Sequence, residues 1–391
     1  MINKPIIILD ITTNLQKTIF DIVIEQMKRE LEFEVHVINL ESWYKRGISL
    51  EEFPVVYNLI PDNKASQNVW QNQEVADEFY SYLGYYEHNL SEVISQNESI
   101  QLFITTDDTG RFEKKTIEVF KKNKIPTVFL AHGFTPTHNF NYLSFLIKSK
   151  LFRKDEIYPF GLNGADYLIA INKSQYNFFL KWSLNFKKTF LTGYPYIDLL
   201  YEYISIKKTD IVEPSSLLFI SSDYASFNYN FHTYIINKIL PVLSKKFKSV
   251  TILLKQGESI SNWNINCKVL ESVKIIENKL HILDVYKLIS SYEYVCGATS
   301  QLVLEAAVLG KKIFLVRDSS QKKSDYFSLI NLGKVQCFTE QNIERIESSS
   351  FQPIDKSVIS LLLDKSFLKF DGRNGKRVAI VLKELFRSSK K

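Results

Sequence analysis

Long apolar runs are missing from this sequence of 391 residues. The longest extend from Pro5 to Leu9 and from Val250 to Leu254, whereas a membrane-spanning helix needs roughly 20 apolar residues. The N-terminal segment turns polar at Asp10 and has neither the apolar run nor the small-residue cleavage site of a secretory signal. We therefore expect no transmembrane helix, and a protein that stays in the cytoplasm.

Cysteine, glycine, proline and excess charge of one sign are also scarce. The three cysteines, Cys267, Cys296 and Cys337, have no CxxC spacing and no nearby histidine, so we interpret them as small buried hydrophobic residues. With 13 Gly and 10 Pro the chain is neither fibrous nor of low complexity. Lys plus Arg number 49 against 43 Asp plus Glu, a formal +6 that is too weak to predict nucleic-acid binding.

Several motifs of known chemistry are absent as well. The sequence has no GxxxxGK[ST] loop, no GxGxxG after its first apolar run, no HExxH and no GxSxG, so phosphate-loop, dinucleotide, zinc-protease and hydrolase functions have no motif to support them. It also lacks a DxD carboxylate pair that would hold a divalent cation. We therefore expect chemistry without a metal and without a cofactor.

What the sequence does contain is a regular alternation of short apolar runs and amphipathic segments, which is typical of parallel α/β proteins. Strands are predicted at 5–11, 33–40, 101–106, 126–131, 167–171, 189–192, 216–221, 249–255, 273–276, 294–297 and 311–316. Helices are predicted at 15–31, 112–123, 174–184, 229–247, 282–290, 300–309 and 375–386.

The pattern pauses once, near the middle of the chain. Residues 204–215 (ISIKKTDIVEPS) are polar and fit neither a strand nor a helix well. We expect two α/β domains, 1–206 and 216–391, joined by a linker at 207–215, with the final helix packing back on the first domain. In such domains ligands bind at the carboxyl ends of the strands.

The most informative segment is CGATSQLVLEAAVLGKKIFLV, in which a strand ends, the chain turns and a helix begins. The unpaired amides at such a helix start favour phosphate, and Thr299 and Ser300 add hydroxyl groups. Glu305 follows within the helix, and Gly310 suits the turn back into the next strand. The alternative is that Thr299 and Ser300 only cap the helix and that Glu305 is a solvated helix residue.

A second candidate site follows the strand at 126–131. This strand delivers His132 and Gly133 to its carboxyl end, where an imidazole can act as a general base or donate to phosphate. Gly133 leaves room for a ligand to approach. A structural histidine is the alternative.

A third candidate follows the strand at 101–106, in the segment TTDDTGR. Asp107 and Asp108 are suited to accept a proton from a hydroxyl group, and paired carboxylates raise the pKa of one partner. Asp, Thr and Gly also form ordinary turns and helix caps. In the second domain, Ser222 and Lys255 each follow a strand, and Lys255 is suited to pair with a phosphate.

In order and spacing, these motifs resemble bacterial GT-B-type transferases that build capsule, teichoic-acid or other surface glycans, a superfamily that includes CDP-glycerol glycerophosphotransferases and nucleotide-sugar 2-epimerases. The resemblance covers most of residues 101–386. The matching residues are the Ala131-His132-Gly133 strand end, a TGxPxxD segment (Thr192, Gly193, Pro195, Asp198), a GxxS…EAxxLGK segment (Gly297, Ser300, Glu305, Ala306, Leu309, Gly310, Lys311) and a DGxxxxR segment (Asp371, Gly372, Arg377).

This resemblance implies a GT-B fold of two Rossmann-like domains facing each other across a cleft, with the nucleotide donor bound by the second domain and the acceptor by the first. By that likeness Thr299 and Ser300 meet the donor phosphates, Glu305 the ribose or donor sugar, and His132 the reacting centre. The expected activity is metal-independent transfer of a sugar from a nucleotide donor to a growing surface glycan or lipid-linked acceptor. Transfer of a polyol phosphate from a CDP donor, epimerisation of a nucleotide sugar and non-catalytic binding are the alternatives.

The segment 141–154 (NYLSFLIKSKLFRK) combines basic and apolar residues. It is predicted either to contact the inner face of the membrane or an acidic acceptor, or to form an ordinary amphipathic helix packed on the first domain.

Overall fold

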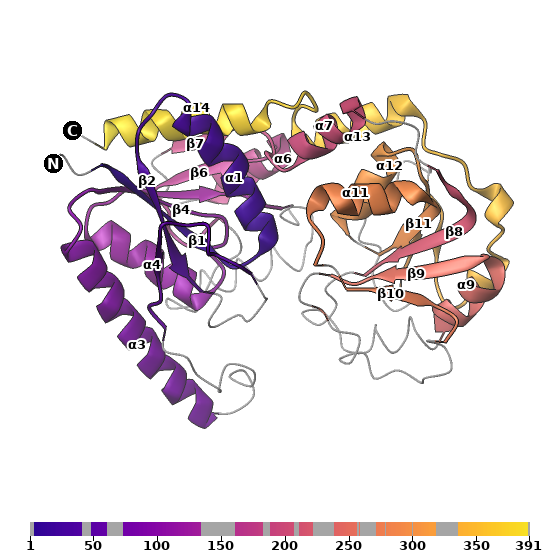
Figure 1. Ribbon diagram of the computed structural model, residues 1–391, viewed down its shortest axis with the longest axis horizontal. Coiled ribbons are helices and arrows are strands. Elements are labelled where there is room, and N and C mark those ends of the chain that lie inside the picture. The colour runs from indigo at the N-terminus through magenta and orange to yellow at the C-terminus, as the bar shows by residue number, and fades with distance from the viewer. Residues whose placement is uncertain are drawn as a thin grey trace. The chain divides into compact units, whose positions relative to one another are not determined.

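The structure, a computed structural model, describes residues 4–40, 48–60, 73–133, 161–182, 188–206, 211–221, 238–255, 258, 271–277, 279–298, 300–317 and 335–389, with the backbone alone described for 73–79, 182 and 364–365. The chain divides into two compact units (Figure 1). Unit 1 comprises Met1–Asp198 and Phe367–Lys391, and unit 2 comprises Leu199–Ser366. The last part of the chain therefore returns to the unit in which the chain began.

Unit 1 contains a parallel sheet of seven strands in the order β3-β2-β1-β4-β5-β6-β7. Its strands are β1 (Ile6–Ile11), β2 (Glu34–Asn39), β3 (Val55–Tyr57), β4 (Ile100–Thr105), β5 (Thr127–Leu130), β6 (Tyr167–Ala170) and β7 (Lys188–Leu191). Its helices are α1 (Asn14–Lys28), α3 (Gln73–Ser95), α4 (Arg111–Lys122), α6 (Lys173–Trp182) and α14 (Asn374–Ser388). The strand order reverses between β1 and β4, and ligands of parallel sheets bind at such a reversal.

Local sequence explains how this unit is assembled. Every residue of β1 is buried, as expected for a central parallel strand covered on both faces. Thr13 begins α1 by a capping box with Gln16, which satisfies two backbone amides of the first turn. Helix α14 packs along α1 (Figure 1), and Lys383 of α14 pairs with Glu30 at 2.6 Å.

Unit 2 contains a second parallel sheet, of six strands in the order β10-β9-β8-β11-β12-β13. Its strands are β8 (Glu213–Ile220), β9 (Ser249–Leu253), β10 (Lys274–Ile276), β11 (Tyr292–Gly297), β12 (Lys312–Val316) and β13 (Cys337–Phe338). Helices α9 (Leu240–Lys246), α11 (Ile282–Ser291), α12 (Gln301–Val308) and most of α13 (Lys356–Phe367) belong to it. The strand order reverses here between β8 and β11.

Stacked aromatic rings fill much of the core of unit 2. The ring of Phe314 on β12 lies 5.0 Å from that of Phe351 and 6.0 Å from that of Phe247, with interplanar angles of 18° and 10°. Cys296 is buried in the same core, as the sequence predicts for a small hydrophobic residue. Aromatic pairs of this kind stabilise beyond their buried area.

Part of the predicted linker, 207–215, belongs to a strand in the structure. Helix α7 (Ile197–Ile206) begins in unit 1, continues into unit 2 and extends through Ile206, and β8 already begins at Glu213. The backbone amide of Ser215 donates to the side chain of Glu293 at 2.7 Å where the pairing of β8 with β11 shifts register. The Glu293 carboxylate thus takes the place of a backbone hydrogen bond between the two strands. The polar, proline-containing sequence of this segment does not reveal that it belongs to a strand.

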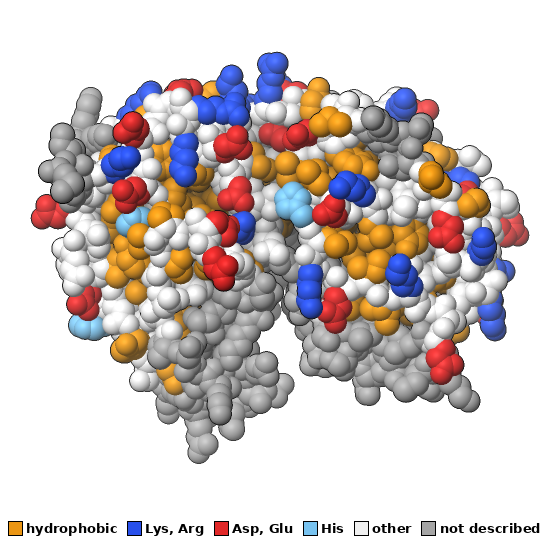
Figure 2. Space-filling view, in the orientation of Figure 1, with side chains coloured by type: hydrophobic (Ala, Val, Ile, Leu, Met, Phe, Trp, Pro, Cys, Tyr) orange, Lys and Arg blue, Asp and Glu red, His pale blue; other side chains and the backbone are white. Residues whose placement is uncertain are grey.

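The described residues of the face shown in Figure 2 carry charges of both signs. In Figure 2, Lys and Arg side chains alternate with Asp and Glu side chains over the described residues of the face shown, in line with the formal net charge of +6. Within the part of the chain that the structure describes, no helix is long and apolar enough to cross a membrane.

Candidate functional site

The side chain of His132 is fixed at the carboxyl end of β5. Its Nδ1 is hydrogen-bonded to the backbone carbonyl of Thr106, which follows β4. The hydroxyl of Tyr194 donates to the backbone carbonyl of His132 at 2.7 Å. Because a carbonyl oxygen can only accept, Nδ1 carries the proton and Nε2 holds the lone pair of the neutral ring. His132 is half-buried, so it is not a residue of the closed core.

Gly133 follows directly and is held by a residue of helix α6. Its carbonyl accepts a hydrogen bond from Gln175 Nε2 at 3.2 Å. Gln175 Oε1 also accepts from the backbone amide of Ile171, and the backbone amide of Gln175 donates to Asn172 Oδ1. The start of α6 therefore holds Gly133 in place. Among the residues that the structure describes, a Cβ added to Gly133 would meet nothing within 4 Å. The close approach of a ligand to Gly133 stays a prediction.

Asp107 forms a turn. Its Oδ1 accepts hydrogen bonds from the amide and the hydroxyl of Thr109 at 2.9 and 2.8 Å. These bonds close an Asx-type turn between β4 and α4. The geometry therefore favours the alternative in which Asp107 shapes the loop that carries Thr106.

Asp108 is fully buried and holds another loop in place. Its carboxylate accepts from the amide of Gly161 at 2.9 and 3.0 Å and from the amide of Asn163 at 3.0 Å. Burial raises the pKa of Asp108 to about 7, against the opposing effect of those amides. Gly161 has φ +81°, and its added Cβ would clash with the ring of Phe179. The geometry favours a structural role for Asp108 over the predicted role of base.

In unit 2, Ser300 begins α12 directly after the loop that follows β11. Its Oγ accepts from the amide of Leu302 at 3.3 Å. The helix start that the sequence predicts as a phosphate site is therefore formed at the carboxyl end of β11, beside the strand reversal of this sheet.

Glu305 lies within α12 and is fully buried. Its Oε1 accepts from Gln301 Nε2 at 2.6 Å, and its Oε2 makes no hydrogen bond with any described residue. Burial raises the pKa of Glu305 to about 7, although Gln301 and the hydroxyl of Tyr286 favour its charged form. The alternative drawn from the sequence, in which Glu305 is a solvated helix residue, is wrong, because Glu305 is fully buried. A buried carboxylate with an oxygen left over needs a further partner.

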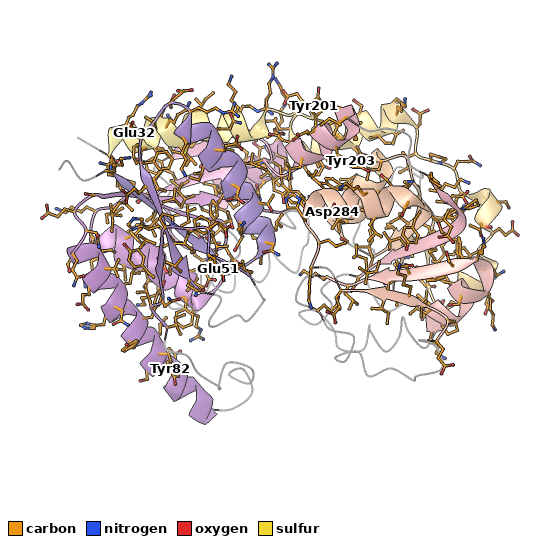
Figure 3. The ribbon with its side chains drawn as sticks, viewed as in Figure 1. Glu32, Glu51, Tyr82, Tyr201, Tyr203 and Asp284 are labelled. Atoms are coloured by element: carbon orange, nitrogen blue, oxygen red, sulfur yellow. The ribbon has the colours of Figure 1, made fainter. Side chains whose placement is uncertain are left out.

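Tyr286 is itself held by α7. The ring of Tyr203 lies 5.7 Å from that of Tyr286, and the Tyr203 hydroxyl donates to Ser290 Oγ at 3.2 Å. Figure 3 shows Tyr203 on α7 beside the helix that carries Asp284, which is α11. The packing of α7 on α11 thus supports the hydroxyl next to Glu305.

Lys255 lies exposed after β9, and its loop contains an acid that the sequence analysis missed. Glu258 Oε2 accepts from Ser221 Oγ at 2.6 Å and from the amide of Lys255 at 2.9 Å. This carboxylate joins the carboxyl ends of β8 and β9. The predicted site residues Ser222 and Thr299 and the predicted basic segment 141–154 lie outside the described residues.

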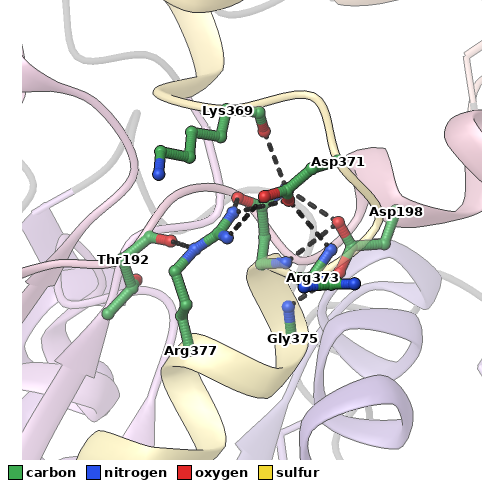
Figure 4. Close-up of polar contacts among 8 residues, drawn as sticks. Thr192, Asp198, Lys369, Asp371, Arg373, Gly375 and Arg377 are labelled. Atoms are coloured by element: carbon green, nitrogen blue, oxygen red, sulfur yellow. Dashed lines mark hydrogen bonds and ion pairs between the residues drawn. The ribbon is translucent and has the colours of Figure 1, made fainter.

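The TGxPxxD and DGxxxxR segments contact each other in unit 1 (Figure 4). Asp198 accepts from the amides of Asn374 and Gly375 at 3.1 and 2.8 Å, and thereby caps α14. Arg377 donates to the carbonyl of Thr192 at 2.7 Å and binds both carboxylate oxygens of Asp371 at 2.9 and 3.0 Å. Both segments therefore dock the C-terminal helix on the first sheet.

A buried acid at the end of β1 was also missed by the sequence analysis. Asp10 is fully buried, and neither of its carboxylate oxygens makes a hydrogen bond with a described residue. Burial and the nearby carboxylate of Glu113 raise its pKa well above the ordinary value. Among the residues that the structure describes, no group of three His, Cys, Asp or Glu is arranged to hold a metal ion.

Known structures share this architecture over nearly the whole chain. UDP-GlcNAc 2-epimerase from Neisseria meningitidis bound to UDP-GlcNAc is similar with a TM-score of 0.62 and 16% identity, over 97% of this chain and 100% of that one. UGT89C1 from Arabidopsis thaliana is similar with a TM-score of 0.59 and 12% identity, over 98% of this chain and 100% of that one. The wall teichoic acid polymerase TagF is similar with a TM-score of 0.51 and 13% identity, over 99% of this chain and 90% of that one.

These likenesses, together with the two parallel sheets, confirm the predicted fold. The chain has the GT-B architecture of two Rossmann-like units, shared with nucleotide-sugar 2-epimerases and transferases. No protein-family model matches the chain, and no curated protein matches it in sequence.

Proposed function

We propose that the protein transfers a sugar from a nucleoside diphosphate donor to a hydroxyl group of a glycan or lipid-linked acceptor in the assembly of a bacterial surface glycan. The observation that carries the proposal is His132, whose Nδ1 is bound to the Thr106 carbonyl, so that Nε2 is its basic nitrogen. His132 lies two residues after the end of β5 in unit 1, and the helix start that we assign to phosphate lies in unit 2.

The donor would bind at the carboxyl ends of β8 and β11. The start of α12 at Ser300 would meet the diphosphate, because helix N-termini attract anions. Glu305 would accept hydrogen bonds from a ribose or sugar hydroxyl through Oε2, the oxygen that has no hydrogen-bond partner among described residues. Neighbours named for UDP-GlcNAc and for the teichoic acid polymerase support uridine or cytidine diphosphate as the carrier.

The reaction needs one base and a stabilised leaving group. His132 Nε2 would take the proton of the acceptor hydroxyl as its oxygen bonds to the anomeric carbon. The bond from that carbon to the diphosphate would break, and the nucleoside diphosphate would leave with the electron pair. The α12 start and Lys255 would stabilise its charge.

Epimerisation of a nucleotide sugar is the second candidate, and it is favoured by the 2-epimerases among the neighbours. Inverting a carbon centre requires a proton to be removed from one face and returned on the other. Asp107 and Asp108 hold turns and Asp10 is fully buried, so we assign proton transfer at this edge to the half-buried His132. This favours transfer over epimerisation.

The first test is thermal unfolding with UDP, CDP, GDP, dTDP and ADP, because a ligand at about 100 times its dissociation constant stabilises by roughly 2.7 kcal/mol. We expect UDP or CDP to raise the melting temperature, and the rise to shrink in Ser300→Ala and Glu305→Gln. Glu293→Gln is the control, since Glu293 pairs with Lys312 near the start of β11. No shift with any nucleotide would contradict the donor site.

The second test separates the two reactions. The protein is incubated with a nucleotide sugar alone, and the sugar is analysed by NMR. Transfer predicts an unchanged sugar until an acceptor is added, with release of nucleoside diphosphate thereafter. A new epimer in the absence of acceptor would contradict transfer and establish the second candidate.

A further inference from the structure

Tyr194 stands between His132 and the C-terminal segment of the chain. It is fully buried, and its hydroxyl reaches the backbone carbonyl of His132 at 2.7 Å, 62 residues away in sequence. The ring of the same residue, His132, is hydrogen-bonded to the Thr106 carbonyl. His132 is thus anchored at its backbone and at its ring by two different strand ends.

The other side of Tyr194 contacts the returning chain. Its ring is stacked on that of Phe367, with centroids 5.9 Å apart and an interplanar angle of 11°. Phe367 is the first residue of unit 1 after the chain leaves unit 2. The C-terminal segment 367–391 therefore touches the side chain that holds His132.

The neighbours of Tyr194 in sequence are fixed by the same segment. Thr192 accepts from Arg377 at 2.7 Å. Gly193 has φ +93°, and an added Cβ would lie 3.2 Å from the Phe367 carbonyl and clash with Asn374 Oδ1. Three consecutive residues, 192–194, are therefore clamped by α14 and by the residue at which α13 ends.

We propose that the C-terminal segment 367–391 positions the imidazole of His132 through the Phe367–Tyr194 stack and the hydrogen bond from the Tyr194 hydroxyl to the His132 carbonyl. Tyr194 and Phe367 are positioning residues in this scheme. The inference rests on the proposed function only in giving His132 the role of base.

The effect on chemistry follows from how strictly a base must be placed. A displacement of about 1 Å can cost on the order of 100-fold in rate. Tyr194→Phe removes the hydrogen bond and keeps the aromatic ring, so Phe367 retains its stacking partner. Because donor binding is assigned to unit 2, kcat should fall about 10-fold while KM for the donor stays within about twofold.

The matched control is Tyr292→Phe. Tyr292 is a buried tyrosine at the start of β11, and its hydroxyl donates to Thr251 Oγ1 at 2.7 Å. Tyr292→Phe removes an equivalent hydrogen bond at the start of β11, whereas the proposed donor site lies at the end of that strand. We expect its kcat to remain within about twofold of wild type. Equal kcat values for Tyr194→Phe and Tyr292→Phe would overturn the proposal.

A measurement without turnover keeps the inference separate from the proposed function. The protein with ¹⁵N-labelled histidine side chains, of which the chain has six, is studied by NMR at alkaline pH, where imidazoles are neutral. His132→Gln assigns the signal. We expect the Nδ1–H tautomer in wild type and Tyr292→Phe, and a mixture with the Nε2–H tautomer in Tyr194→Phe and Phe367→Leu.

An unchanged tautomer in Tyr194→Phe would overturn the proposal even if the protein proves to be a transferase. A mixture in Tyr194→Phe with wild-type behaviour in Phe367→Leu would overturn the role of the C-terminal segment. A protein inactive with every donor but showing the expected tautomers would refute the proposed function and leave the positioning of His132 established.

Discussion

Arg377 Nε donates to the backbone carbonyl of Thr192 at 2.7 Å, across 185 residues of sequence. The same guanidinium binds both carboxylate oxygens of Asp371 and lowers the pKa of that acid. One planar side chain thus satisfies a strand-end carbonyl and the acid of its own motif (Figure 4), which only arginine has the geometry to do.

Arg377→Lys should therefore destabilise unit 1. A lysine ammonium keeps the charge and loses the paired geometry, so we expect a loss of about 1 to 3 kcal/mol in the free energy of unfolding. Chemical denaturation measures it. Arg387→Lys is the control, because Arg387 lies exposed on the same helix. Equal midpoints for the two variants would show that charge alone suffices at position 377.

Two glycine substitutions should act in opposite directions. Gly193→Ala places a Cβ at φ +93° against Asn374 Oδ1, and we expect a loss of more than about 2 kcal/mol. Gly84 lies exposed within α3, and its added Cβ would meet nothing within 4 Å. Gly84→Ala should therefore stabilise by about 0.5 to 1 kcal/mol. Urea unfolding of both variants checks the pair, and a stable Gly193→Ala protein would contradict the clash.

Asp108 should make stability fall as the pH rises. Burial raises its pKa to about 7 in the folded protein, from an ordinary value of 3.8. A raised folded pKa gives stability that is present below the unfolded pKa and is lost as the pH rises through the folded one. The unfolding free energy of wild type minus that of Asp108→Asn should therefore decrease between about pH 4 and pH 7. A constant difference across that range would count against a neutral buried acid.

Glu305 should make nucleotide binding depend on pH in the opposite sense. Its pKa is raised by burial to about 7, and only its ionised form accepts hydrogen bonds on both oxygens. Affinity for the nucleotide should rise about threefold or more from pH 6 to pH 8. Calorimetry compares wild type with Glu305→Gln, which carries no titrating group at that position and corrects for titration of the ligand phosphate. Parallel pH profiles would exclude Glu305 from the contact.

His132→Ala should reduce turnover by about 100-fold with little change in nucleotide binding, because a general base contributes roughly 100- to 10,000-fold. His88→Ala is the control, since His88 lies exposed on α3. Steady-state assays with the donor identified by thermal unfolding provide the comparison. Turnover near the wild-type value would remove His132 from the role of base.

The central strands could be predicted because buried parallel strands have nearly continuous apolar sequences. Residues 6–11 and 127–130 are examples, and both lie buried on both faces of the first sheet. Helix α3 was not predicted, because its sequence combines aromatic and polar residues with Gly84, and glycine lowers helix propensity. Strands β3 and β13 have three and two residues and are too short to form a pattern.

For the described candidate residues, the place along the chain relative to strands and helices could be predicted, and the environment could not. The sequence places Asp108 at a strand end, but its partners Gly161 and Asn163 lie 53 and 55 residues further along the chain. Glu305 falls within a helix, and only the packing of α11 and α7 shows that it is buried. Burial of a charged group depends on contacts distant in sequence, so spacing alone does not reveal it.

Unit 1 is interrupted by the whole of unit 2, and this has a consequence for synthesis on the ribosome. Residues 1–198 emerge first, but the cap of α14 by Asp198 and the Phe367–Tyr194 stack wait until Leu199–Ser366 have been translated. At roughly 5 to 20 residues per second this delay is on the order of 10 to 30 seconds. During that interval the face of α1 on which α14 later packs is exposed in the nascent chain. We therefore expect chaperones to bind the chain at this stage.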